Sequence, residues 1–339
     1  MNFDEIMKEI ESGLSGEPEE DIAYLRSQSE KYKEHEYSKE IIRAIGRMMY
    51  ELLPDDKKEE LELLMNQDSL GVKKTLEEVD YYTYKGNYTK VESLMKELIA
   101  KIEELNLFDD DSVSEYHDFQ EYFEEVLYRF IYRPEKVLRG TSIPLSRIYL
   151  HYGSTLVELE KYDEAEVALK KALKWNPVSA DATFEYLDLI KRTGRLEEFF
   201  QEAVKSFKIA FRPAQLARCY RDIAYYFVEN KMWREASSCD LYSLEFDKEK
   251  RQYVQSELYY IQSEAGMVIE PLTIEELEVL AEKYGFPVGG APDVIELAYT
   301  LGKKFVEREQ YEVARYMFEI VYGFVPAEEI KELMDALPD

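Results

Sequence analysis

The stretch that decides the fold runs from Tyr149 to Pro177 and reads YLHYGSTLVELEKYDEAEVALKKALKWNP. Apolar residues recur at helical spacing on both sides of a break at Glu160–Lys161. Gly153 and Ala165 are small, which allows two helix backbones to cross closely. The stretch therefore predicts two antiparallel helices joined by a short turn. Because a single hairpin leaves an apolar face exposed, it needs stacked neighbours to close the core.

Similar hairpins are expected along most of the chain, since strand signals are nearly absent. An aromatic or apolar residue opens the second helix of each expected pair. These residues are Tyr37, Tyr88, Tyr162, Leu196, Trp233 and Tyr311. From Tyr88 onward they recur about every 34 to 39 residues, or at twice that distance. We expect about eighteen helices, among them one at 55–65 and one at 113–131.

Two units resemble the tetratricopeptide repeat, whose pattern is W-x₂-L-G-x₂-Y…A-x₃-F…P. In the middle unit the matching residues are Tyr149, Tyr152, Gly153, Leu156, Ala165, Leu169 and Pro177. In the last unit they are Ala298, Leu301, Gly302, Phe305, Ala314, Phe318 and Pro326. The close resemblance covers roughly 146–248 and 295–326. The first of these ranges includes a weaker copy of the repeat, which has Asp240 in place of an aromatic residue. The resemblance implies an all-α fold, a right-handed solenoid of helical hairpins.

The repeats suggest three parts. We expect divergent helical hairpins over 1–142 and tetratricopeptide-like repeats over 143–266. A C-terminal repeat pair with a capping helix is expected over 267–339, because the last segment carries acids on one face of an amphipathic helix.

Composition limits the classes of partner. Asp and Glu number 71 against 43 Lys and Arg, which gives a net charge of -28. Such a surface repels phosphate backbones, which argues against nucleic-acid binding and against docking on anionic membranes. The N-terminus lacks an apolar leader pattern, and only two cysteines are present. We therefore expect a cytoplasmic protein, and the charge predicts a monomer or weak dimer.

Signatures of catalysis or of metal binding are missing from the sequence. Cys219 and Cys239 have no histidine in the same repeat, so we interpret them as buried apolar residues. The acidic run 109–111 does not fit a calcium loop. We interpret it as a turn leading to an N-cap at Ser112 that begins the helix 113–131. We expect no enzyme activity, no cofactor and no metal.

Charge is distributed unevenly, which points to a binding surface. Residues 1–140 have a net charge of -16, residues 141–260 of -1 and residues 261–339 of -11. The family resemblance implies that the first helix of each pair lines a concave groove. The face of these helices opposite the apolar packing stripe predicts a partner groove, which comprises Arg147, His151, Phe184, Arg192, Arg218, Arg221 and Tyr225.

An alternative for this face is purely structural, because Glu185, Asp188 and Asp222 lie on it and can pair with the arginines. If such pairs are exposed, replacing Arg218 and Arg221 by Ala should leave the melting temperature nearly unchanged. His151 and Glu185 stand where family members that clamp a peptide carboxylate have Asn, so the sequence does not predict that clamp.

The leading hypothesis is a non-enzymatic scaffold that binds a protein or peptide segment in the concave face. The alternative is a bacterial regulatory sensor that binds a short signalling peptide or a small metabolite.

Overall fold

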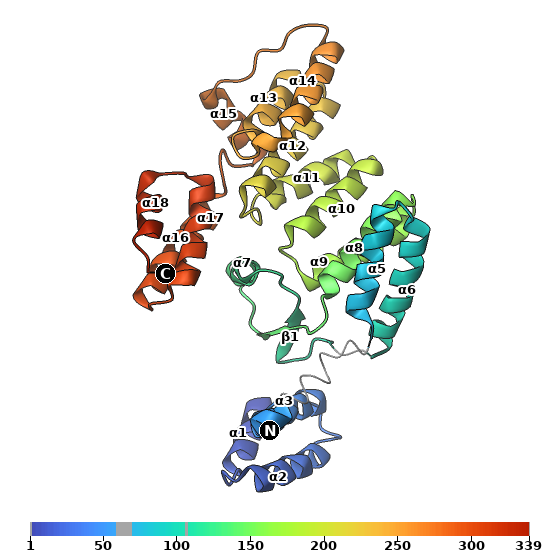
Figure 1. Cartoon of the computed structure of the whole chain (residues 1–339), viewed down its shortest axis with the longest axis vertical. Coiled ribbons are helices and arrows are strands. Elements are labelled where there is room, and N and C mark those ends of the chain that lie inside the picture. Colours follow the sequence, from blue (N-terminus) through green and yellow to red (C-terminus); the bar gives the residue numbers. More distant parts are fainter. Residues whose placement is uncertain (1, 59–69, 106–107, 339) are drawn as a thin grey trace. The chain divides into compact units, whose positions relative to one another are not determined.

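The computed structural model describes residues 2–58, 70–105 and 108–338. Helices dominate these residues, and neighbouring helices pack in succession, which confirms the predicted all-α fold of helical repeats (Figure 1). Part of the helix expected at 55–65 lies outside the described residues. Among the residues that are described, no helix is both long and apolar enough to cross a bilayer.

The chain divides into two compact units. Unit 1 comprises 1–120 and 129–177, and unit 2 comprises 121–128 and 178–339. The division into three parts at 1–142, 143–266 and 267–339 rests on repeat similarity and stays a prediction.

Unit 1 begins with three helices around a small apolar core. They are α1 (Phe3–Ser12), α2 (Pro18–Lys31) and α3 (Ser38–Glu51). Ile6, Ile10, Leu25, Ile41 and Ile45 form the centre of this core. Two helical pairs follow: α5 (Val72–Tyr84) with α6 (Tyr88–Leu105), and α8 (Leu145–Glu158) with α9 (Tyr162–Trp175).

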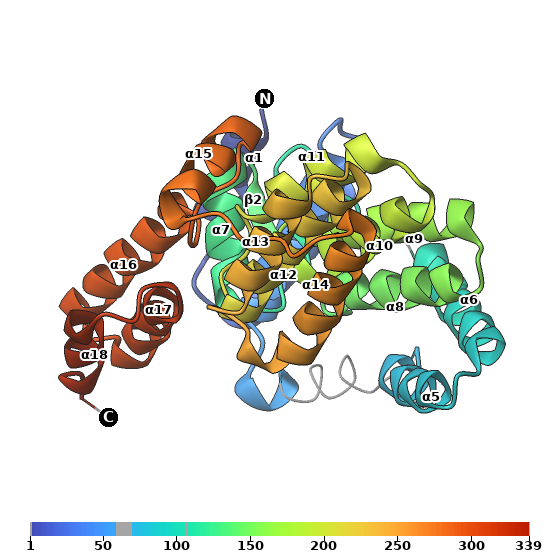
Figure 2. The ribbon, with the colours of Figure 1, turned by 90° about the horizontal axis from the view of Figure 1, so that it is seen from above.

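The predicted hairpin of α8 and α9 is confirmed, and both views show the two helices side by side (Figures 1 and 2). A Cβ atom added at Gly153 would lie only 2.6 Å from Cδ2 of Leu169. The small residue is therefore needed for the two helices to approach this closely.

The predicted helix 113–131 is wrong over its first half, and only its second half is helical. Strand β1 (Ser114–His117) comes first, then α7 (Tyr122–Tyr132), then strand β2 (Val137–Gly140). The strands are parallel, with Ser114 opposite Val137 and His117 opposite Gly140. Parallel strands need a crossover connection, and α7 lies within it.

The expected N-cap at Ser112 is also wrong. Asp111 instead accepts hydrogen bonds from the backbone N–H groups of Val113 (3.0 Å) and Ser114 (2.7 Å). The N–H of Ser112 donates to Glu40 at 3.0 Å, and Arg43 pairs with Asp111 at 2.8 Å. These contacts from a distant helix hold the segment extended.

Unit 2 is a succession of packed helices. They are α10 (Ala180–Arg192), α11 (Leu196–Ser206), α12 (Pro213–Glu229), α13 (Trp233–Ser243), the short 3₁₀ helix η1 (Lys248–Lys250), α14 (Arg251–Ala265), α15 (Ile274–Tyr284), α16 (Pro292–Glu307), α17 (Tyr311–Phe324) and α18 (Glu328–Asp335). Tyr220 on α12 is fully buried, and its hydroxyl donates to the carbonyl oxygens of Pro287 (2.7 Å) and Gly289 (3.1 Å). Gly302 repeats the role of Gly153, because a Cβ there would lie 2.6 Å from Cε1 of Phe318.

Candidate functional site

Two pockets that share three lining residues form the candidate site in unit 2. Lys191, Arg221 and Tyr253 line both pockets. The first, of about 250 Å³, is completed by Asp188, Arg218, Asp222 and Lys250, and we name it the basic pocket. The second, of about 310 Å³, is completed by Tyr225, Val228, Glu229, Asp240, Glu257 and Tyr260, and we name it the acidic pocket. Together they make a groove between side chains of α10, α12, α13, η1 and α14.

Arg218 binds two carboxylates in the lining of the basic pocket. Its Nη2 donates to Asp188 at 2.6 Å, and its Nε donates to both carboxylate oxygens of Asp222 at 3.0 and 3.1 Å. The guanidinium also lies over the ring of Phe184, 5.6 Å from its centroid. The pairing with acids on the same face that the structural alternative requires is therefore present at Arg218.

Asp222 is buried, with only 4% of its surface exposed. Burial raises the pKa of Asp222 to about 6, although the positive charge of Arg218 opposes the rise. Asp222 is thus the buried member of the cluster, so removing Arg218 would leave a buried carboxyl without its partner.

Arg221 is engaged less completely. Its Nη1 lies 3.5 Å from Oδ2 of Asp247, within ion-pair distance. This nitrogen is nevertheless buried and has no hydrogen-bond acceptor. Burial lowers the pKa of Arg221, and the neighbouring Asp247 opposes the change.

Asp240 is the most unusual group of the groove. It is only 3% exposed, it lines the acidic pocket, and its carboxyl accepts no hydrogen bond from any residue that the structure describes. Burial raises the pKa of Asp240 to about 8, and Glu257 adds to the rise, while Arg221 and Lys191 oppose it. Buried polar groups in folded proteins nearly always have a partner.

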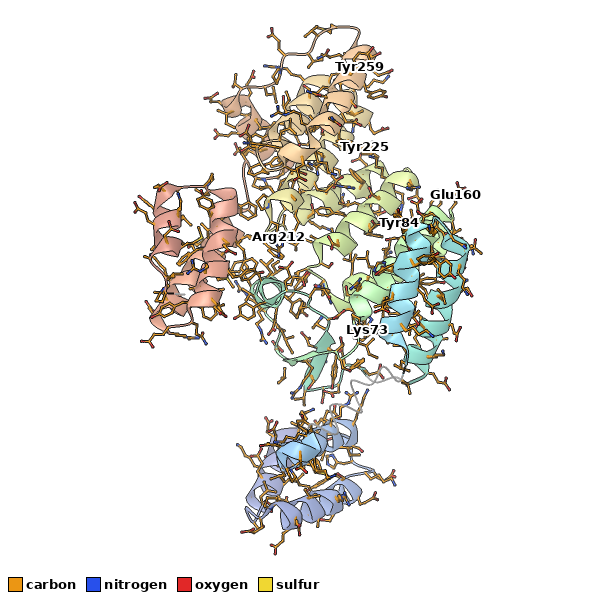
Figure 3. All side chains as sticks on the ribbon, in the orientation of Figure 1. Lys73, Tyr84, Glu160, Arg212, Tyr225 and Tyr259 are labelled. Atoms are coloured by element: carbon orange, nitrogen blue, oxygen red, sulfur yellow. The ribbon has the colours of Figure 1, made fainter. Side chains whose placement is uncertain are left out.

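Tyrosines form the walls of the acidic pocket. Tyr225 extends from α12, and Tyr253 and Tyr260, each about half exposed, extend from α14. Figure 3 labels Tyr225 on its helix. The Lys191 ammonium lies over the Tyr225 ring, 3.7 Å from its centroid. This distance is typical of a cation–π contact.

The structure gathers some of the predicted groove residues and separates others. Arg218, Arg221 and Tyr225 line the groove, and Phe184 lies against Arg218. Arg192 is exposed at the end of α10 and lines neither pocket.

Arg147 and His151 lie on α8 of unit 1, where they form a feature of their own. The Arg147 Nε donates to Nε2 of His151 at 3.3 Å, and its Nη2 lies 3.7 Å from Asp80. Burial lowers the pKa of His151, and the charge of Arg147 lowers it further. Their place in a partner groove stays a prediction.

Sequence reasoning missed several groove residues. Tyr253, Glu257 and Tyr260 are spaced by four and three residues, so helical periodicity alone places them on one face of α14. That signal was present in the sequence. Asp240 was visible as a polar residue at an aromatic position, but its burial was not.

The two cysteines of unit 2 are fully buried, as expected. Burial raises the pKa of Cys219 to about 12 and raises that of Cys239 well above its ordinary value. With the pKa values raised this far, neither thiol is ionised at neutral pH. A cysteine nucleophile needs the ionised form, the thiolate. Within the described ranges, no group of three or more His, Cys, Asp or Glu is placed to hold a metal ion.

Comparison with known proteins gives one family match. Residues 146–179 match the model of the tetratricopeptide repeat, which confirms the resemblance of this unit. The match covers α8 and α9. No curated protein matches the chain.

Proposed function

We propose that this chain, whose residues 146–179 match the tetratricopeptide repeat, is a non-enzymatic scaffold that binds a peptide segment of a partner protein in the groove of unit 2. One observation carries this proposal: side chains of the alternate helices α10, α12 and α14 line two pockets that share Lys191, Arg221 and Tyr253. In repeat proteins such a surface is the usual place for a partner.

The composition of the groove supports the same use. Arginine and tyrosine are the residue types most enriched where partner proteins bind tightly, and both line this groove. Tyr253 and Tyr260 are partly exposed in the groove, so a partner segment can cover them.

Affinity capture with matched tyrosine variants tests the proposal. The bait is the tagged full chain, used in lysate of the cell that produces it, and captured proteins are identified by mass spectrometry. We expect the wild type to retain a partner that is lost in the double variant Tyr253→Ala/Tyr260→Ala. The control is Tyr259→Ala on the same helix, because Tyr259 is 79% exposed and lines neither pocket (Figure 3).

Two results would contradict the proposal. One is that no protein is captured above background under several salt conditions. The other is that the double variant captures the same protein as efficiently as the wild type and Tyr259→Ala do.

A further inference from the structure

We infer that the acidic pocket receives a basic side chain, lysine or arginine, from the bound segment. This inference rests on the proposed function and specifies the chemistry of the partner. It starts from the Asp240 carboxyl, which is buried, faces the pocket and has no hydrogen-bond donor among the described residues. A bound ammonium or guanidinium group would supply the missing donors.

The pocket has more carboxyl groups than cations to neutralise them. Glu229, Asp240 and Glu257 line it, and none of the three forms an ion pair within the part of the chain that the structure describes. Of the two cations, Arg221 pairs with Asp247, which is not a lining residue. Two cations therefore face three carboxyls, and one of these cations is already paired.

The tyrosines favour the same kind of ligand. The ammonium of Lys191 already lies 3.7 Å from the centroid of the Tyr225 ring, so the pocket accommodates a cation over an aromatic face. Tyr253 and Tyr260 offer two further rings in the same pocket. A volume of about 310 Å³ has room for one long side chain.

Other ligand chemistries fit less well. An anion in the acidic pocket would meet three carboxyl groups. Of the two arginines that line the basic pocket, Arg218 is already held by Asp188 and Asp222, and Arg221 lies 3.5 Å from Asp247. A metal ion would need at least three converging ligands, and the described residues provide no such group. A basic side chain uses both the carboxyls and the rings.

The probe is a phage library of random twelve-residue peptides, selected on the full chain. Phages that also bind the Tyr253→Ala/Tyr260→Ala variant are removed. We expect one position of the selected peptides to be Lys or Arg. In the synthetic peptide, norleucine for that Lys or citrulline for that Arg should weaken binding at least tenfold, as measured by fluorescence anisotropy.

Asp240→Asn ties this preference to the pocket, because Asn keeps the shape of the carboxyl and cannot become charged. We expect Asp240→Asn to weaken binding of the selected peptide at least tenfold. The same variant should bind the norleucine or citrulline peptide as tightly as the wild type does. The matched control is Glu282→Gln on α15, which removes one exposed acid that lines neither pocket and should change affinity less than twofold. If Asp240→Asn does not fold, Glu257→Gln replaces it, with an expected loss of at least threefold.

The outcomes separate this inference from the function on which it rests. Peptides that bind through the tyrosines but carry no basic residue would overturn the inference and leave the scaffold proposal standing. A folded Asp240→Asn that binds the selected peptide as tightly as the wild type would do the same. If no peptide is selected, both proposals fail.

Discussion

Arg218 binds two carboxylates at once, and one of them, Asp222, is buried. The sequence led us to expect exposed pairs whose loss would barely change the melting temperature. The structure instead shows that Asp222 is buried, and removing Arg218 would leave its charge uncompensated. We expect Arg218→Ala to lower the free energy of unfolding by about 2 kcal/mol or more, as measured by urea denaturation.

Two variants serve as controls for this prediction. Arg251→Ala removes an exposed arginine at the start of α14 and should change the free energy of unfolding by less than about 0.5 kcal/mol. Arg218→Ala combined with Asp222→Asn should recover most of the lost stability, since no buried charge remains. Equal stability of Arg218→Ala and Arg251→Ala would contradict the role given to the pair.

Asp240 predicts a dependence of stability on pH. Its pKa is raised to about 8 in the folded chain, against about 4 for an ordinary Asp in the unfolded chain. The folded state therefore keeps the Asp240 proton to a higher pH than the unfolded state does. The resulting stabilisation of the folded state is complete below about pH 4 and is lost as pH rises toward 8. The loss is at most about 1.4 kcal/mol per pH unit.

Comparison with Asp240→Asn isolates this effect from the other charged groups around it, Lys191, Arg221 and Glu257. We expect the stability of the wild type relative to Asp240→Asn to fall between pH 5 and pH 8, as measured by urea denaturation at several pH values. A difference that stays constant, or that grows with pH, would show that Asp240 is ionised in the folded chain.

At the scale of elements, the helical pairs depend on close contact at two glycines. Gly153 faces Leu169 and Gly302 faces Phe318, both of which are buried side chains with little room to move. We expect Gly153→Ala and Gly302→Ala each to destabilise the chain by about 1 to 3 kcal/mol, because the added methyl group forces the helices apart. Thermal unfolding measures the change.

Gly46 provides the matched control for these two glycines. It lies within α3, and a Cβ there would meet no atom within 4 Å. Gly46→Ala should therefore stabilise the chain by up to about 1 kcal/mol, the gain in helix propensity. If Gly302→Ala raises the melting temperature as Gly46→Ala does, then close packing is not the reason for glycine at 302.

At the scale of the whole molecule, the net charge of -28 opposes self-association. Repulsion between two copies is screened as salt increases, because the Debye length falls from about 30 Å at 0.01 M to about 10 Å at 0.1 M. We expect a monomer at low salt, and any weak dimer should become stronger as salt rises. Light scattering over a salt series measures this, and a dimer that strengthens as salt falls would contradict the argument.

The sequence alone determined the helical pairs. Helices α9 and α17 begin at Tyr162 and Tyr311, where second helices are expected, because the apolar spacing, the breaks and the small residues that define a hairpin are all local. The same periodicity grouped Arg218, Arg221 and Tyr225 on one helix face, and all three line the pockets of unit 2.

Only the tertiary structure decided what depends on distant neighbours. Strand β1 replaces an expected helix because Asp111, itself held by Arg43 on α3, binds the backbone where the helix would begin. Helical periodicity shows which face of a helix a residue occupies, but not which other helices cover that face. For this reason the burial of Asp222 and Asp240, and with it the chemistry of the groove, became visible only once α10, α12, α13 and α14 were packed together.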